Sequence, residues 1–218
     1  MVMKGLKVSI PFLLIMVGLT VYGYWRVGFG AEVPSTFDLE GNVVGTQSST
    51  GLFVLMPGCA LFLVLVFAIL PAIDPRGQNF KASQGLFFAS WFGALLTMLV
   101  SHAMIIFSAV HQSEPDIRWV LATSAVLLIA VGNYMSKSRS TWFMGLRTPW
   151  TLSSEHAWTV ANRVTGWLLV LCGLLSLAIG FFKEPFVGTL VMGVGAVVSC
   201  VIGVVVSYFA WRADPERG

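Results

Sequence analysis

Long apolar runs separated by short polar segments dominate the chain. A helix needs about 20 predominantly apolar residues to cross a bilayer. Six stretches meet this requirement, and they cover residues 6–25, 52–71, 84–110, 117–135, 164–182 and 187–211. The pattern therefore predicts an all-α polytopic membrane protein with six transmembrane helices.

The polar segments between these spans suggest further structure, and residues 72–83, which contain Asp74-Pro75-Arg76-Gly77, are predicted to form a turn. In residues 26–51, Phe37 and Leu39 alternate with polar residues before Gly41, and an apolar pair follows, which predicts a small β-hairpin. Residues 1–83 are accordingly expected to form an N-terminal helix pair that contains this segment. Residues 84–218 are expected to form a four-helix region with a polar connection at 136–163.

The distribution of Lys and Arg predicts the orientation, because cytoplasmic loops carry an excess of both. With the N-terminus inside, ten basic residues are cytoplasmic and three lie outside. The inner set is Lys4, Lys7, Arg76, Lys81, Lys137, Arg139, Arg147, Arg163, Arg212 and Arg217, and the outer set is Arg26, Arg118 and Lys183. Both termini and the 136–163 connection are therefore predicted to be cytoplasmic, and the hairpin extracellular.

Composition agrees with an integral membrane protein and excludes several function classes. The 218 residues are 56% hydrophobic and 11% charged, with a net charge of +3. A soluble domain is about 25% charged. The basic residues are divided among short loops, which argues against direct nucleic-acid binding.

Neither an enzyme nor a cofactor site is indicated. The sequence has no HExxH, GxSxG or Walker motif. Cys59, Cys172 and Cys200 fall inside apolar spans without a CxxC spacing, so we interpret them as small packing residues. We predict no catalytic residue, no metal site and no cofactor.

Small residues recur at every fourth position in three spans, which favours close helix contacts, since apolar burial does not drive helix association in lipid. They are Gly85, Ala89, Gly93, Thr97 and Ser101 in the third span, Cys172, Ser176 and Gly180 in the fifth, and Gly195, Ser199, Gly203 and Ser207 in the sixth. We expect these faces to form helix–helix interfaces.

His102 is an ionisable side chain well inside a span, and it has two interpretations. Intramembrane ionisable groups mark functional sites by default because they are costly in hydrocarbon. A neutral His that donates to a carbonyl or Ser oxygen would also be stable there, and no second His or acid at the same depth supports a metal site or a proton relay.

The 136–163 connection holds the main functional candidates. Pro149 disfavours helical dihedrals at Thr148, so Arg147 to Trp150 should be extended or turning. Ser153 or Ser154 can then cap a helix with Glu155 in its first turn. Arg147 is interpreted either as a positive-inside charge or as a donor to Glu155 or a lipid phosphate.

Asn133 and Arg163 allow two interpretations as well. Arg163 could extend to the interface, as basic residues at helix ends do. Alternatively, Asn133, Arg163 and Glu155 bind one another and form a cytoplasmic recognition surface.

The same residues resemble the signature of the SdpI family of bacterial membrane proteins. The resemblance rests on the runs Gly132-Asn133-Tyr134-Met135, Gly145-Leu146-Arg147-Thr148-Pro149-Trp150-Thr151-Leu152-Ser153-Ser154-Glu155 and Asn162-Arg163-Val164-Thr165-Gly166, together with Trp158. Pro34, Phe37 and Gly41 resemble the extracellular segment that precedes this signature in the family.

The resemblance implies a multi-pass protein of the bacterial cytoplasmic membrane that protects its producer from a membrane-active toxin peptide. It also implies a second role, as a receptor that recruits a cytoplasmic autorepressor. The partners expected are therefore the lipid bilayer, a toxin peptide and that repressor. Two alternatives stay open: a transporter or channel whose pathway runs past His102, and a structural accessory protein.

Overall fold

A computed structural model describes residues 1–38, 43–113 and 115–215 of the chain. Six helices in it are long and apolar enough to cross a membrane, as the sequence predicted. They are α1 (Val2–Val27), α2 (Ser49–Ile73), α4 (Gln84–His111), α5 (Arg118–Met135), α7 (Glu155–Phe182) and α8 (Pro185–Ala213). The short helices α3 (Gly77–Ala82) and α6 (Pro149–Ser153) lie between them. The chain is thus a multi-pass membrane protein.

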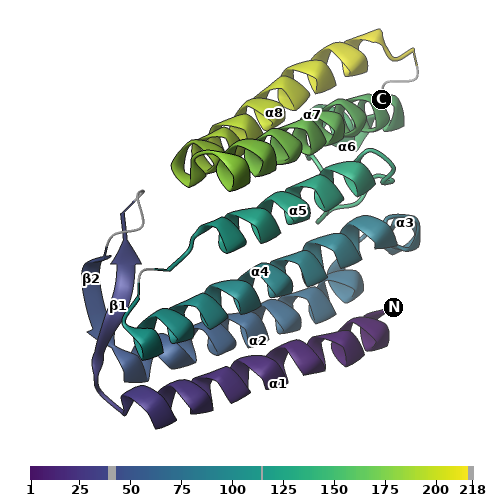
Figure 1. Ribbon diagram of the computed structural model, residues 1–218. Coiled ribbons are helices and arrows are strands. Elements are labelled where there is room, and N and C mark those ends of the chain that lie inside the picture. The colour runs from purple at the N-terminus through teal and green to yellow at the C-terminus, as the bar shows by residue number, and fades with distance from the viewer. Residues whose placement is uncertain (39–42, 114, 216–218) are drawn as a thin grey trace.

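The six long helices run side by side (Figure 1). Helices α1, α2 and α4 pack against one another, α5 lies against α4, α7 against α5, and α8 against α7. A two-stranded hairpin lies at one end of this arrangement. Helix α3, the connection that contains α6, and both chain termini lie at the other end. The hairpin and this connection, the two regions predicted to be functional, are therefore separated by the length of the helices.

The predicted hairpin is present between α1 and α2. Strand β1 (Glu32–Phe37) pairs antiparallel with β2 (Val43–Ser48), with Glu32 opposite Ser48 and irregular pairing near Thr36. Its turn, including Gly41, lies outside the described residues. Val33 is buried among Leu52, Phe53 and Ile106, so the hairpin is anchored to the ends of the helices.

The predicted small-residue faces of α7 and α8 meet. The Ser176 hydroxyl donates to the Gly188 carbonyl at 2.8 Å. A Cβ at Gly195 would lie 2.5 Å from the Cys172 sulfur, and one at Gly203 would collide with the Thr165 hydroxyl. In α4, Gly85 and Gly93 face Tyr134 and Leu127 of α5, respectively. The expected role of these faces in helix contacts is therefore confirmed.

Two boundaries differ from the prediction. Residues 72–83, predicted to be a turn, contain α3. The fifth span was predicted to begin at residue 164, but α7 begins at Glu155 because the Ser154 side chain accepts a hydrogen bond from the Ala157 amide at 2.9 Å. The connection between α5 and α7 is therefore residues 136–154, which we call the strap.

Candidate functional site

The strap is built around a capped turn at Thr148. Thr148 has extended dihedrals, φ −120° and ψ 162°, and its hydroxyl accepts a hydrogen bond from the Thr151 amide at 3.1 Å. In return, the Thr148 amide donates to the Thr151 hydroxyl at 2.8 Å. Pro149 follows at the first helical position, where its missing N–H is not needed. The predicted extended conformation is correct at Thr148 and wrong at Trp150, which lies in α6.

Asn162 of α7 forms hydrogen bonds with the strap. Its side chain is buried, its Oδ1 accepts from the Leu146 amide at 2.7 Å, and its Nδ2 donates to the Trp158 carbonyl at 3.0 Å. A non-helical backbone amide next to a helix needs such a partner, since an unpaired buried donor is costly. Asn162 therefore fixes the position of the strap on α7.

Gly145 lets the strap approach α7 closely. Its φ of +88° is a conformation that L side chains rarely adopt. A Cβ there would lie 2.7 Å from Asn162 Oδ1 and 2.9 Å from the Trp158 ring. Trp158 is fully buried, and its Nε1 donates to the Ser138 carbonyl at 3.1 Å. The Trp158 side chain is thus part of the core beneath the strap.

The charged candidates are not brought together. Arg147 is exposed and donates to the Trp142 carbonyl at 2.7 Å, instead of pairing with Glu155. Asn133 is exposed and accepts from Lys137 Nζ at 3.1 Å, which gives it a different partner from Arg163 and Glu155. Among the described residues, no hydrogen bond joins Asn133, Arg163 and Glu155, and Glu155 precedes Arg163 by eight residues on α7, so the predicted cluster does not form in this structure.

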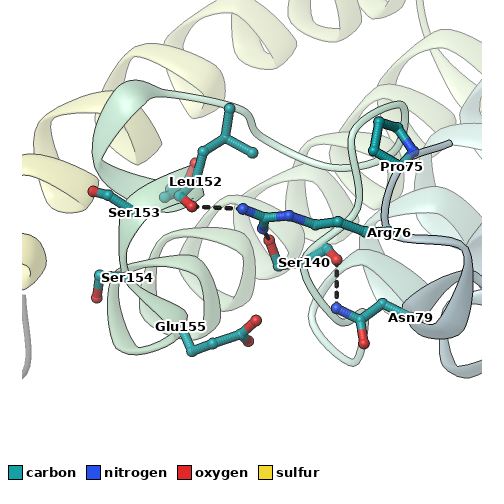
Figure 2. A pocket seen from close by; sticks show the side chains of 9 residues that line it. Pro75, Arg76, Asn79, Ser140, Leu152, Ser153, Ser154 and Glu155 are labelled. Carbon is teal, nitrogen blue, oxygen red and sulfur yellow. Dashed lines mark hydrogen bonds between the residues drawn. The ribbon is translucent and has the colours of Figure 1, made fainter. Parts of the chain in front are cut away.

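A polar pocket of about 450 Å³ lies where the strap meets the α2–α3 loop. Arg76 Nη2 donates to the Leu152 carbonyl at 2.8 Å, and Nη1 donates to the Ser140 hydroxyl (Figure 2). Asn79 Nδ2 donates to the Ser140 carbonyl at 2.8 Å. The Glu155 side chain points toward Ser140 and Asn79. A cation, a carboxylate and several hydroxyls therefore surround one cavity, although the sequence indicated only a turn at 72–83.

Further hydrogen bonds tie the strap to distant helices. The Asp74 carboxylate accepts from the Arg76 amide at 2.7 Å and from the Trp142 amide at 3.2 Å. On the other side, the Thr148 and Ser207 hydroxyls lie 3.0 Å apart, and Ser154 donates to Asp214. The strap therefore joins the end of α2 to the end of α8.

His102 lies at a junction of three helices. The Thr20 hydroxyl of α1 donates to the Phe53 carbonyl of α2 at 3.0 Å, so it accepts from His102 Nε2 at 3.1 Å. The same nitrogen lies 3.2 Å from the Met16 carbonyl. This geometry favours the helix-linking interpretation of His102. Within the described ranges, no three His, Cys, Asp or Glu side chains are grouped as a metal site.

Comparison with known proteins identifies the region that contains the strap. Residues 137–209 match the model of the SdpI/YfhL protein family. The chain is also 30% identical over 127 residues to the protein named Immunity protein SdpI of Bacillus subtilis (strain 168). That alignment covers 58% of this chain and 60% of the relative, so less than two thirds of the relative is matched. No solved structure matches the chain. Residues 137–209 of this chain are thus similar to the SdpI/YfhL protein family.

Proposed function

We propose that this chain is a membrane-embedded immunity protein that gives resistance to a membrane-active toxin peptide. The observation that carries the proposal is the 30% identity to a relative named as an immunity protein. The proposed function contains no chemical step, so the residues singled out act by binding and positioning.

The proposed location is the bacterial cytoplasmic membrane, with both termini inside. The ten-to-three distribution of basic residues supports this orientation. It is also consistent with the chain termini lying at the end opposite the hairpin (Figure 1). In this orientation the hairpin and the outer helix ends meet the toxin.

The toxin is proposed to contact the hairpin near its junction with α4. A cavity of about 500 Å³ there is lined by Glu32 and Pro34 of β1 and by Gln112 and Ser113 after α4. Pro34, which the sequence singled out together with Phe37 and Gly41, is thus part of this cavity. The cavity offers both apolar walls and polar groups, which suits an amphipathic peptide.

The strap is proposed as the inner contact surface, to which a cytoplasmic autorepressor binds. Arg147, Pro149 and Ser153 are exposed there, and the pocket between Arg76 and Glu155 opens beside them. A receptor role requires two arrangements of the helices with different affinities for toxin and repressor. The bonds from the strap to α2 and α8 offer a physical link for such a change.

The test is survival of a toxin-sensitive bacterium that expresses the wild-type protein, Arg147→Ala, Ser35→Asp or the control Lys81→Gln at matched membrane levels. The wild type and the control should protect. Ser35→Asp should weaken protection because it adds a charge to the outer surface. Equal killing of cells with and without the protein, across several peptide toxins, would refute the immunity function.

Among the described residues, the contacts of His102 and Thr97 do not favour the transporter alternative. His102 is hydrogen-bonded to α1 and, through Thr20, to α2, and Thr97 donates to the Gly93 carbonyl of its own helix at 3.0 Å. Substrate-dependent flux in proteoliposomes would favour transport over immunity.

A further inference from the structure

A groove between α5 and α7 opens near the strap end of both helices. It has a volume of about 360 Å³ and is lined mainly by apolar side chains, among them Val126, Ile129, Trp167 and Val170. Helices α5 and α7 lie side by side over this region (Figure 1). The groove is distinct from the polar pocket around Arg76.

A pair of glycines brings the two helices together at the floor of the groove. A Cβ at Gly132 would lie 2.5 Å from the Gly166 carbonyl oxygen, and one at Gly166 would collide with the Gly132 carbonyl. Close backbone approach of this kind stabilises helix pairs in lipid. Because neither residue has a side chain, the space above this contact remains open.

The groove faces outward from the helices. Trp167 is 67% exposed and Val126 is 51% exposed, although both lie within candidate membrane spans. Within a bilayer such a surface is in contact with acyl chains instead of water. The natural occupant of the apolar part is therefore a lipid chain.

Two cationic side chains lie at the strap end of the groove. Lys137 Nζ donates to Asn133 Oδ1 at 3.1 Å, and Asn133 itself lines the groove. Arg163 is exposed and lies one helical turn before Trp167, on the same face of α7. Glu155 precedes Arg163 by eight residues, which is about 12 Å along α7. Among the residues that the structure describes, no acidic side chain lines the groove.

We propose that this groove binds an anionic phospholipid, with an acyl chain between α5 and α7 and its phosphate beside Lys137 and Arg163. Basic pockets between transmembrane helices on the cytoplasmic side suit anionic headgroups. Asn133 positions the Lys137 ammonium toward the mouth of the groove. This site gives Asn133, Arg163 and Gly166 a shared role that does not depend on the immunity function.

Native mass spectrometry of the intact protein in mixed micelles of phosphatidylglycerol and phosphatidylcholine tests the proposal. The wild type should retain phosphatidylglycerol preferentially. The double variant Lys137→Gln/Arg163→Gln should bind it roughly 25-fold more weakly, because each basic side chain near an anionic headgroup contributes about fivefold. Lys81→Gln, which removes an exposed charge at the same end of the protein, should match the wild type.

A second variant, Val126→Trp, fills the apolar end of the groove without changing a charge. It should lower retention of phosphatidylglycerol while circular dichroism reports unchanged helix content. Equal retention of the two lipids by the wild type would overturn the proposal. So would a loss in Lys81→Gln as large as in the double variant, or full retention by Val126→Trp.

Discussion

Replacing Asn162 by Leu keeps the number and branching of the side-chain heavy atoms and removes both polar groups. The Leu146 amide, which donates to Asn162 Oδ1 at 2.7 Å, then loses its partner. Leu146 is a half-buried residue of the strap and Asn162 is 1% exposed, so water does not readily replace the amide oxygen.

The expected cost is about 2 kcal/mol, since a buried donor left unpaired costs about 1–3 kcal/mol. The two other lost bonds run from Nδ2 to the Trp158 and Leu146 carbonyls. They add little, because the Trp158 carbonyl also accepts the backbone hydrogen bond of α7 and the Leu146 carbonyl also accepts from the Thr151 hydroxyl. The strap should therefore detach from α7 more often, without loss of the six long helices.

Unfolding by detergent titration, followed by tryptophan fluorescence, measures this free energy. Asn133→Leu is the matched control, because Asn133 is exposed and, among the described residues, its side-chain amide is hydrogen-bonded only to Lys137. The control should lie within about 0.5 kcal/mol of the wild type, as exposed substitutions usually do. Equal stability of the two variants would refute the assignment of Asn162 as the anchor of the strap.

Three further substitutions test other contacts. Gly132→Leu should separate α5 from α7 and destabilise the protein by about 1–3 kcal/mol in the same titration, whereas Gly193→Leu, whose site is open, should not. His102→Leu should lower the free energy of unfolding by about 1 kcal/mol, as is typical of intramembrane hydrogen bonds. If His102 only links helices, toxin resistance should stay intact, and loss of resistance at normal stability would contradict this role. Arg76→Lys should make the strap about tenfold more susceptible to limited proteolysis, because Lys cannot bond Ser140 and Leu152 together; wild-type cleavage rates would show that these bonds are unimportant.

Local rules predicted much of the fold. The lengths of the apolar stretches predicted six spanning helices, and the small residues at every fourth position predicted the faces through which α7 and α8 are in contact. Ser154 and Glu155 indicated the start of a helix correctly. The hairpin was predicted from a short alternation, and its observed strands extend further, from Glu32 to Ser48. These features depend on residues that are close in sequence.

The organisation of the site was not predictable in the same way. The pocket depends on Arg76 reaching Leu152, which is 76 residues away. Nothing near Asp74-Pro75-Arg76 in the sequence identifies that partner. An Arg147–Glu155 pair, one of the interpretations left open for Arg147, rests on opposite charge alone. Exposed ion pairs contribute little to stability, and the Trp142 backbone carbonyl accepts from Arg147 instead. Thr148 as a helix cap could have been recognised from Thr-Pro followed by Thr151.

The central claim is that the strap and the hairpin lie on opposite sides of the membrane, with the strap inside. Its most direct test labels single cysteines at the exposed Ser153 or at Ser35, in a background where Cys59, Cys172 and Cys200 are replaced by alanine. A membrane-impermeant maleimide added to intact cells should modify Ser35→Cys at once and Ser153→Cys only after permeabilisation. Labelling of Ser153→Cys in intact cells, or of both positions from the same side, would contradict the account.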